Sequence, residues 1–281
     1  MADAAPPRKR RRGRLRRVAL TLLLLGVALL PACGHLQVAL LPVAEWIGPE
    51  GVYRFDVGDQ RVMALTIDDG PSAHTDAILD LLAERGHTAT FFVHPDHTDA
   101  LGPAGRASVQ RILDEGHELG NHTAADGPSV RLTPEAFAAS FKQADEALRE
   151  LGVTPRWFRT AGGTFNPDTM SPLLIQYGYD PRFAMASFVP WDTFLHLPAT
   201  YGKQLGARGY PGAILVLHEG IGEQAGRGER TMITLRRLLE ETDRRGYRLR
   251  TLSEVEALSR EWRFTGGAGS GTPPRRRRRR G

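Results

Sequence analysis

The sequence of 281 residues contains a single cysteine, Cys33. One thiol cannot form an intramolecular disulfide, so the fold has to rest on its hydrophobic core. The chain also lacks an internal repeat, which excludes solenoids and propellers. Hydrophobic residues make up 41% of the chain and charged residues 25%. These proportions are typical of one globular domain of ordinary size with extensions.

Positive charge is scarce between the two ends of the chain. The formal net charge is +5, which by itself would suggest a nucleic-acid binder. However, residues 1–17 hold eight Lys or Arg, and residues 275–280 are consecutive arginines. Because these two segments carry more than the whole excess, the residues between them are net negative and would repel a phosphate backbone. We therefore expect no nucleic-acid partner, and we interpret the basic ends as a targeting region and a solvated tail.

An apolar run over residues 18–30 follows the Arg-rich start. It is shorter than the roughly 20 residues that span a bilayer, and it matches the hydrophobic region of a signal peptide. Apolar residues resume at 36–47, so an uncleaved membrane anchor is the alternative. Leu30-Pro31-Ala32-Cys33 resembles the lipobox of bacterial lipoproteins; otherwise Cys33 is a lone inert cysteine. On each of these interpretations, residues 1–33 direct the protein out of the cytoplasm. The protein is then either secreted or held at the membrane.

Apolar runs and helical patterns alternate from about residue 61 onward. Short apolar runs bounded by turn residues predict strands over 62–67, 88–93, 157–159, 213–217 and 247–250. Helical spacing of apolar residues predicts helices over 74–84, 108–115, 133–151, 167–177, 230–245 and 253–259. This alternation predicts an α/β fold of parallel strands, closed as a barrel or left open. We assign residues 34–59 to a linker, 60–263 to the folded domain and 264–281 to a disordered Arg-rich tail.

Two adjacent carboxylates follow the first predicted strand, in Thr66-Ile67-Asp68-Asp69-Gly70-Pro71. In parallel α/β folds, functional residues gather at the carboxyl ends of the strands. Neighbouring carboxylates repel each other unless a cation or a proton separates them. The alternative is an Asx turn with one solvated aspartate, and the dipeptide alone does not decide between the two.

Two further segments carry groups that bind metals or move protons. His122 and Asp126 are four residues apart, so on a helical turn they would share one face and could hold a divalent metal. A capped turn with a surface histidine is the alternative. His218 leaves the apolar strand 213–217 and could be a general acid, or else a buried structural histidine. His117 has no such partner, and we expect it to be structural.

Taken in order, these segments resemble the polysaccharide deacetylase family, the NodB-homology domain of carbohydrate esterases, over about residues 60–260. Further segments carry the resemblance: Ala89-Thr90-Phe91-Phe92-Val93, Gly116 to Thr123, Trp157-Phe158-Arg159, Leu215 to Gly220, and Gly246-Tyr247. The resemblance implies a distorted (β/α) barrel of about seven strands, with residues 60–263 as the catalytic domain. It implies a metal-dependent hydrolase that deacetylates an N-acetylated polysaccharide, such as a chitin-like or peptidoglycan-type glycan.

The resemblance also implies a role for each catalytic residue. Asp68 would be the general base, and Arg159 would orient it. His218 would be the acid that protonates the leaving amine, which is a poor leaving group otherwise. Asp192 could hold His218 charged and in place.

The same resemblance implies Asp69 and His122 as metal ligands. Where the family usually carries a second histidine, four residues after the first, this chain has Asp126. We expect Asp126 to be the third ligand, in a site richer in oxygen than usual. Zinc is the first expectation for the divalent metal, and manganese or cobalt become more plausible in such a site.

Two departures bear on the substrate. The chain has Thr160-Ala161-Gly162-Gly163 after Arg159, where the family usually has prolines in a loop that shapes the substrate groove. Trp191 could stack on a sugar face or belong to the core. We expect an acetylated glycan as the partner and a monomer as the working state. The competing functions are an O-acetyl esterase on the same fold and a sugar-binding homologue without turnover.

Overall fold

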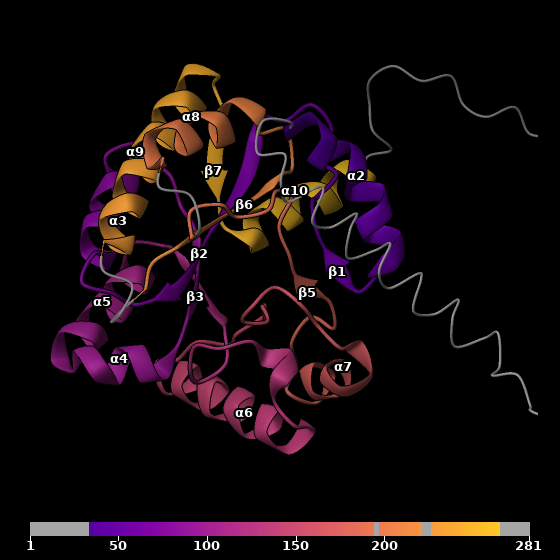
Figure 1. Ribbon diagram of the computed structural model, residues 1–281, viewed down its shortest axis with the longest axis vertical. Coiled ribbons are helices and arrows are strands. Elements are labelled where there is room, and N and C mark those ends of the chain that lie inside the picture. The colour runs from indigo at the N-terminus through magenta and orange to yellow at the C-terminus, as the bar shows by residue number, and fades with distance from the viewer. Residues whose placement is uncertain (1–33, 194–196, 221–225, 265–281) are drawn as a thin grey trace, which may run out of the picture.

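The computed structural model describes residues 34–193, 197–220 and 226–264 (Figure 1). Its strands are β1 (Gly51–Val52), β2 (Val62–Gly70), β3 (Thr90–Val93), β4 (Glu118–Asn121), β5 (Phe183–Ala184), β6 (Ile214–His218) and β7 (Arg248–Arg250). Its helices are α2 (Gly34–Ile47), α3 (Thr75–Ala83), α4 (Pro95–Leu101), α5 (Pro103–Asp114), α6 (Pro134–Glu150), α7 (Pro167–Gln176), α8 (Pro198–Arg208), α9 (Arg227–Arg244) and α10 (Leu252–Phe264). A short 3-10 helix covers Ser129–Arg131.

Strand β2 is the centre of the sheet. It pairs in parallel with β3, β6 and β7, and β3 pairs in parallel with β4. Single bridges continue the sheet from Asn121 through Phe158 to β5, which pairs with β1, and Arg54 bridges to Ala213 beside β6. The strands therefore come round into a distorted barrel, which confirms the predicted α/β fold class.

Both faces of β2 are buried, as its continuous apolar run predicts. All nine residues of the strand are buried. Met63, Leu65 and Ile67 alternate onto the face that packs against the main core, together with apolar residues of α3 and α9. Val62 and Ala64 lie on the opposite face with Trp157 and Phe92. Because β2 is fixed on both sides, the residues at its carboxyl end are held rigidly.

The prediction of a linker over residues 34–59 is wrong. Helix α2 and strand β1 lie in this range, and Leu41, Val52, Phe55 and Val57 are buried. The elements were missed because α2 buries only a narrow face and β1 has two residues. The strand expected over 157–159 is also reduced, to single bridges at Phe158.

The predictions for residues 1–33, including the lipidation of Cys33, lie outside the described residues, as does the tail over 265–281. Among the helices that the structure describes, none has both the length and the apolar character needed to cross a bilayer.

Candidate active site

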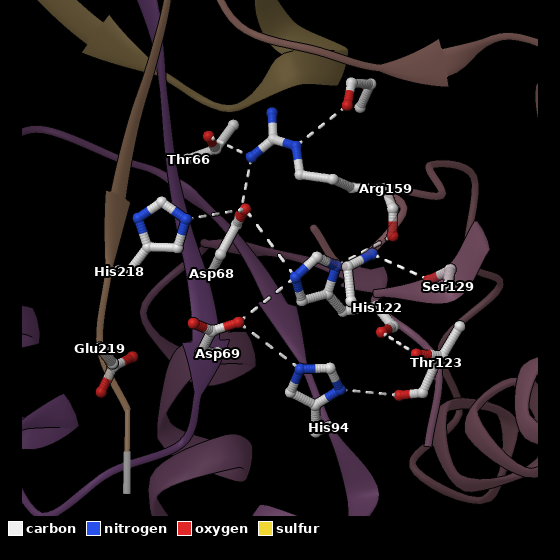
Figure 2. Close-up of polar contacts among 12 residues, drawn as sticks. Thr66, Asp68, Asp69, His94, His122, Thr123, Ser129, Arg159, His218 and Glu219 are labelled. Atoms are coloured by element: carbon white, nitrogen blue, oxygen red, sulfur yellow. Dashed lines mark hydrogen bonds and ion pairs between the residues drawn. The ribbon is translucent and has the colours of Figure 1, made fainter. Parts of the chain in front are cut away.

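The carboxyl ends of the central strands bring together side chains that are far apart in the sequence. In the sheet, Asp68 of β2 is in register with His218 of β6. His94 follows directly after β3, and His122 follows directly after β4. Figure 2 shows these four side chains, with Asp69, pointing toward one another. The expected convergence of strand ends is therefore present.

Asp68 is held by an arginine from the far side of the barrel. The guanidinium of Arg159 donates to Asp68 Oδ1 over 2.7 Å and also donates to Thr66 Oγ1 and to the carbonyl oxygens of Ala184 and Met185. The guanidinium carbon also lies 4.4 Å from the centre of the Phe92 ring. These four hydrogen bonds hold the guanidinium in place, so that Asp68 Oδ1 is fixed and Oδ2 is directed into the site.

Asp69 faces two histidines. Its Oδ1 lies 3.4 Å from His122 Nε2 and 3.5 Å from His94 Nε2. Nδ1 of His122 contacts the carbonyl oxygen of Arg159 over 2.9 Å, and Nδ1 of His94 contacts that of Thr123 over 3.0 Å. A carbonyl oxygen only accepts, so both Nδ1 atoms carry the hydrogen. In the neutral rings, both Nε2 lone pairs then point at the carboxylate, an arrangement that is stable only if a cation or a proton lies between them.

This donor set fits a divalent metal ion. One ligand atom each from Asp69, His94 and His122 lie within 4.8 Å of one another, and all three residues are buried. His94 Nε2 has no hydrogen-bond partner. Burial alone would raise the pKa of Asp69, but the histidines hold that pKa well below its usual value. Burial alone would lower the pKa of His122, but Asp68 and Asp69 raise it instead. The pocket therefore favours positive charge, and imidazole with carboxylate is a common ligand set for zinc.

The expected ligand Asp126 does not belong to this group. It is exposed, and the segment after β4 forms no helical turn. Thr123 adopts a left-handed backbone with φ of 71°, which turns the chain so that positions 122 and 126 no longer share one face. His94 was not among the predicted ligands, although its position in the sequence could have identified it. This histidine immediately follows a buried strand, the same criterion that selected Asp68 and His218.

His218 is paired with Asp192, as expected. Asp192 accepts from the backbone nitrogen of His218 over 2.6 Å, and its Oδ2 lies 3.1 Å from His218 Nδ1. His218 Nε2 faces Asp68 Oδ2 at 3.9 Å. Burial alone would lower the pKa of His218, but the charge and hydrogen bond of Asp192, reinforced by Asp68 and Asp69, raise it to about 9. The imidazole is therefore charged at neutral pH and presents an Nε2 proton to the site.

Two buried charged residues that the sequence analysis did not single out lie behind Asp69. Arg227, at the start of α9, donates to Asp69 Oδ2 over 3.0 Å. Glu219 accepts from the hydroxyls of Ser72 and Thr75, and burial raises its pKa to about 7. Asp69 itself has a left-handed φ of 63°. The backbone of Asp69 is therefore strained. Arg227 fixes one oxygen of its carboxylate, and the other oxygen faces the two histidines.

Trp191 fits the core interpretation better than sugar stacking. It is partly buried and packs against the main core cluster, and its backbone nitrogen donates to Tyr201 Oη over 3.2 Å. The loop over residues 160–163 is attached to the 3-10 helix, because Ala161 and Ser129 exchange hydrogen bonds.

Comparisons with known proteins agree with this geometry. Residues 56–181 match the model of the family described as polysaccharide deacetylase. The chain is 31% identical over 216 residues to a chitooligosaccharide deacetylase of Rhizobium leguminosarum bv. trifolii, an alignment that covers 70% of this chain and 92% of that protein. It is 26% identical over 212 residues to a peptidoglycan-N-acetylglucosamine deacetylase of Bacillus cereus, covering 74% of this chain and 94% of that protein.

The fold is also shared with a solved structure. The crystal structure of the Bc1960 peptidoglycan N-acetylglucosamine deacetylase superposes with a TM-score of 0.64 at 22% identity, over 75% of this chain and 95% of that one. The relatives are deacetylases, which are a class of hydrolases. Within that class, the chain belongs to the polysaccharide deacetylase family.

Proposed function

We propose that the protein is a metal-dependent N-deacetylase of an N-acetylated polysaccharide, with a chitin-like or peptidoglycan-type glycan as the substrate. The observation that carries this proposal is the convergence on Asp69 of two histidines whose Nε2 atoms are free to bind a metal. Asp68 and His218 lie on either side of the same space. The deacetylase relatives support an N-acetylated glycan as the substrate class.

The chain's own residues supply both proton transfers. Asp68, fixed through Oδ1 by Arg159, accepts with Oδ2 the proton of the water that attacks the acetyl carbon. The charged His218, held by Asp192, donates its Nε2 proton to the amide nitrogen as the carbon–nitrogen bond breaks. The products are acetate and a free amine on the sugar. Because the two groups lie on paired strands, their separation is set by the sheet.

Asp69, His94 and His122 would hold the metal ion. A divalent cation bound there polarises the acetyl carbonyl and makes the attacking water more acidic. With His94 in place of Asp126, the set has two imidazoles and one carboxylate. Zinc is therefore our proposed metal, ahead of manganese and cobalt, which prefer more oxygen.

Acetate release from N-acetylglucosamine oligomers tests the proposed function. We expect release by the purified protein, loss of release after chelation, and recovery when zinc is returned. Asp68→Asn should lower kcat by about 10²- to 10⁴-fold, the usual effect of removing a general base, while the bound metal is retained. Asp99→Asn, at a carboxylate whose side chain is 77% exposed, is the matched control and should leave both measurements unchanged.

The same assay separates the competing functions. An O-acetyl esterase would release acetate from O-acetylated glycan and not from the N-acetylated oligomers. An alcohol leaves more easily than an amine, so such an enzyme would also tolerate His218→Gln. A sugar-binding homologue without turnover would bind the oligomers and release no acetate in the presence of any metal.

We also propose that the protein works outside the cytoplasm, held at the membrane by its N-terminal segment. The Arg-rich start, the apolar run over residues 18–30 and the lipobox-like residues before Cys33 support this placement. A reporter enzyme that is active only after export, fused after residue 264, should be active in cells. An inactive fusion that is nevertheless produced at full length would contradict the placement.

A further inference from the structure

Helix α2 carries an apolar face that the described residues cover only in part. Of the eleven large hydrophobic residues exposed in the described chain, four lie on this one helix of 14 residues: Leu36, Val43, Trp46 and Ile47. Trp46 is 82% exposed and Ile47 is 55% exposed. Single exposed hydrophobic residues are normal on a protein surface, but such a group on one element indicates an interaction site.

These residues form one continuous stripe. At about 3.6 residues per turn, positions 36, 43, 46 and 47 fall within about 120° of one another around the helix axis. Ala39, which is exposed, and Leu40, which is half-buried, lie in the same arc. No charged residue interrupts the arc. We call this set of six residues the α2 stripe.

The opposite side of α2 is attached to the body of the protein. Leu41 is buried, and Val38 packs against the main core cluster. Glu45, the only charged residue of the helix, makes two hydrogen bonds of 2.8 and 3.0 Å to the guanidinium of Arg54. The stripe is therefore a fixed feature of the folded domain. In Figure 1 α2 lies at the edge of the ribbon.

The chain that precedes α2 indicates what covers the stripe. Residues 18–30 are apolar, Cys33 is adjacent to the first residue of the helix, and residues 8–17 are rich in arginine. Basic residues remain on the cytoplasmic side of a membrane. An apolar segment or a lipid on Cys33 would therefore place the start of α2 at the outer surface of the bilayer. Tryptophan at the end of an apolar stripe is typical of helices that lie in a membrane interface.

We propose that the α2 stripe lies on the lipid bilayer and fixes the orientation of the catalytic domain on the membrane. The partner is the lipid surface itself. The inference rests on the proposed location at the membrane, and the chemistry of the active site plays no part in it.

The test uses the full chain in vesicles of phosphatidylcholine and phosphatidylglycerol. Brominated acyl chains quench a tryptophan only when it lies in the bilayer, and Trp46→Phe identifies the contribution of Trp46 to the emission. We expect the Trp46 emission to lose most of its intensity in brominated vesicles and to be shielded from aqueous iodide. The triple variant Leu36→Gln, Val43→Gln and Ile47→Gln should abolish most of this quenching. Ile175→Gln and Ile233→Gln, at exposed isoleucines of α7 and α9, are the matched controls and should leave it unchanged.

Three outcomes would overturn the proposal. Free access of iodide to Trp46 in vesicles, without quenching by bromine, would show that the stripe faces water. Shielding that depends on protein concentration in lipid-free detergent solution would assign the stripe to a second copy. Shielding from iodide in vesicles without quenching by bromine, at every protein concentration, would assign it to the preceding segment of the same chain. Acetate release from soluble oligomers, measured on the same samples, would separate each of these outcomes from a failure of the proposed function.

Discussion

The two ends of the parallel strands differ in how far their buried polar groups are hydrogen-bonded. At the amino end, His117 Nδ1 accepts from the backbone nitrogen of Ala89, and Glu118 accepts from Thr90 and from Ser253. At the carboxyl end, His94 Nε2, Glu219 Oε1 and Arg227 Nε are buried without a partner in the structure. Buried polar atoms are costly unless they are hydrogen-bonded. Glu118 and Ser253 at the amino end are therefore hydrogen-bonded within the protein, whereas these three polar atoms at the carboxyl end have hydrogen-bonding capacity that the described chain does not use.

The difference shows that burial and hydrogen bonding identify the site better than the size of a hollow does. A surface hollow of about 500 Å³ lies at the amino end and is lined by His117, Glu118 and Ser253 among others. These side chains already use their polar atoms within the protein. If the two ends differ in this way, substitutions at the carboxyl end should change metal binding or catalysis, and a substitution at the amino end should change stability alone.

The largest effect is expected for His94→Ala. Removing one of three proposed ligands should weaken metal binding by more than about 100-fold. Loss of a residue that only hydrogen-bonds to a ligand already weakens metal binding by up to about 100-fold. Metal content after dialysis, measured by mass spectrometry of the elements, checks this. Asp126→Ala is the matched variant and should retain its metal. If instead Asp126→Ala loses the metal and His94→Ala keeps it, the ligand set implied by the family resemblance is right and the one drawn from the structure is wrong.

Arg227→Gln should have the next largest effect. Asp69 Oδ2 would lose its partner, so the carboxylate would be less well oriented and metal affinity should fall by about 10- to 100-fold. Titration with zinc against a competing chelator measures the change. Arg236→Gln, at an exposed arginine of the same helix, should bind zinc as the unaltered protein does. Equal affinities in both variants would remove Arg227 from the support of the site.

A shift in pH dependence is expected for Asp192→Asn. The raised pKa of His218, about 9, keeps the imidazole protonated below that pH, so kcat should fall as the pH rises through this value. Without the charge of Asp192, the alkaline limb of the kcat profile should move to lower pH, toward the ordinary value of 6.5. An unmoved limb would mean that another group is the acid.

The smallest effect on function is expected at the amino end. Ser253→Ala removes the hydroxyl that donates to Glu118 and accepts from Trp157 Nε1. The loss should lower the free energy of unfolding by about 1–3 kcal/mol, measured by denaturation in urea. Metal content and kcat should stay unchanged. A loss of metal in this variant would break the contrast between the two ends.

The sequence predicted the fold class and most long elements, because the buried strands and amphipathic helices have clear periods. Two-residue strands such as β1 and β5 were missed because they have no period to detect, and the helices α2 and α8 and the strand β4 were not predicted either. Asp68, Asp69, His122, Arg159, Asp192 and His218 were all named from the sequence or the family resemblance, and the structure brings all of them together. Their roles stay predictions until they are measured.

The separation of Asp126 from the group of Asp69, His94 and His122 has a physical cause. Spacing of four residues places two side chains together only on a helix, and a left-handed residue between them, Thr123, cannot be seen in a pattern of residue types. Arg227 and Glu219 were missed for a related reason. Arg227 contacts Asp69, and Glu219 contacts Ser72 and Thr75, each from a distant part of the chain, and no local spacing predicts such contacts.

The pairing of Asp68 with His218 across β2 and β6 has a consequence for engineering. Backbone hydrogen bonding sets the spacing of these two side chains, and the loop over residues 160–163 contributes nothing to it. That loop, with left-handed glycines at 162 and 163, could be exchanged for the corresponding loops of relatives. In such chimeras the pair of Asp68 and His218 should keep its geometry, because the strand register that sets it is untouched.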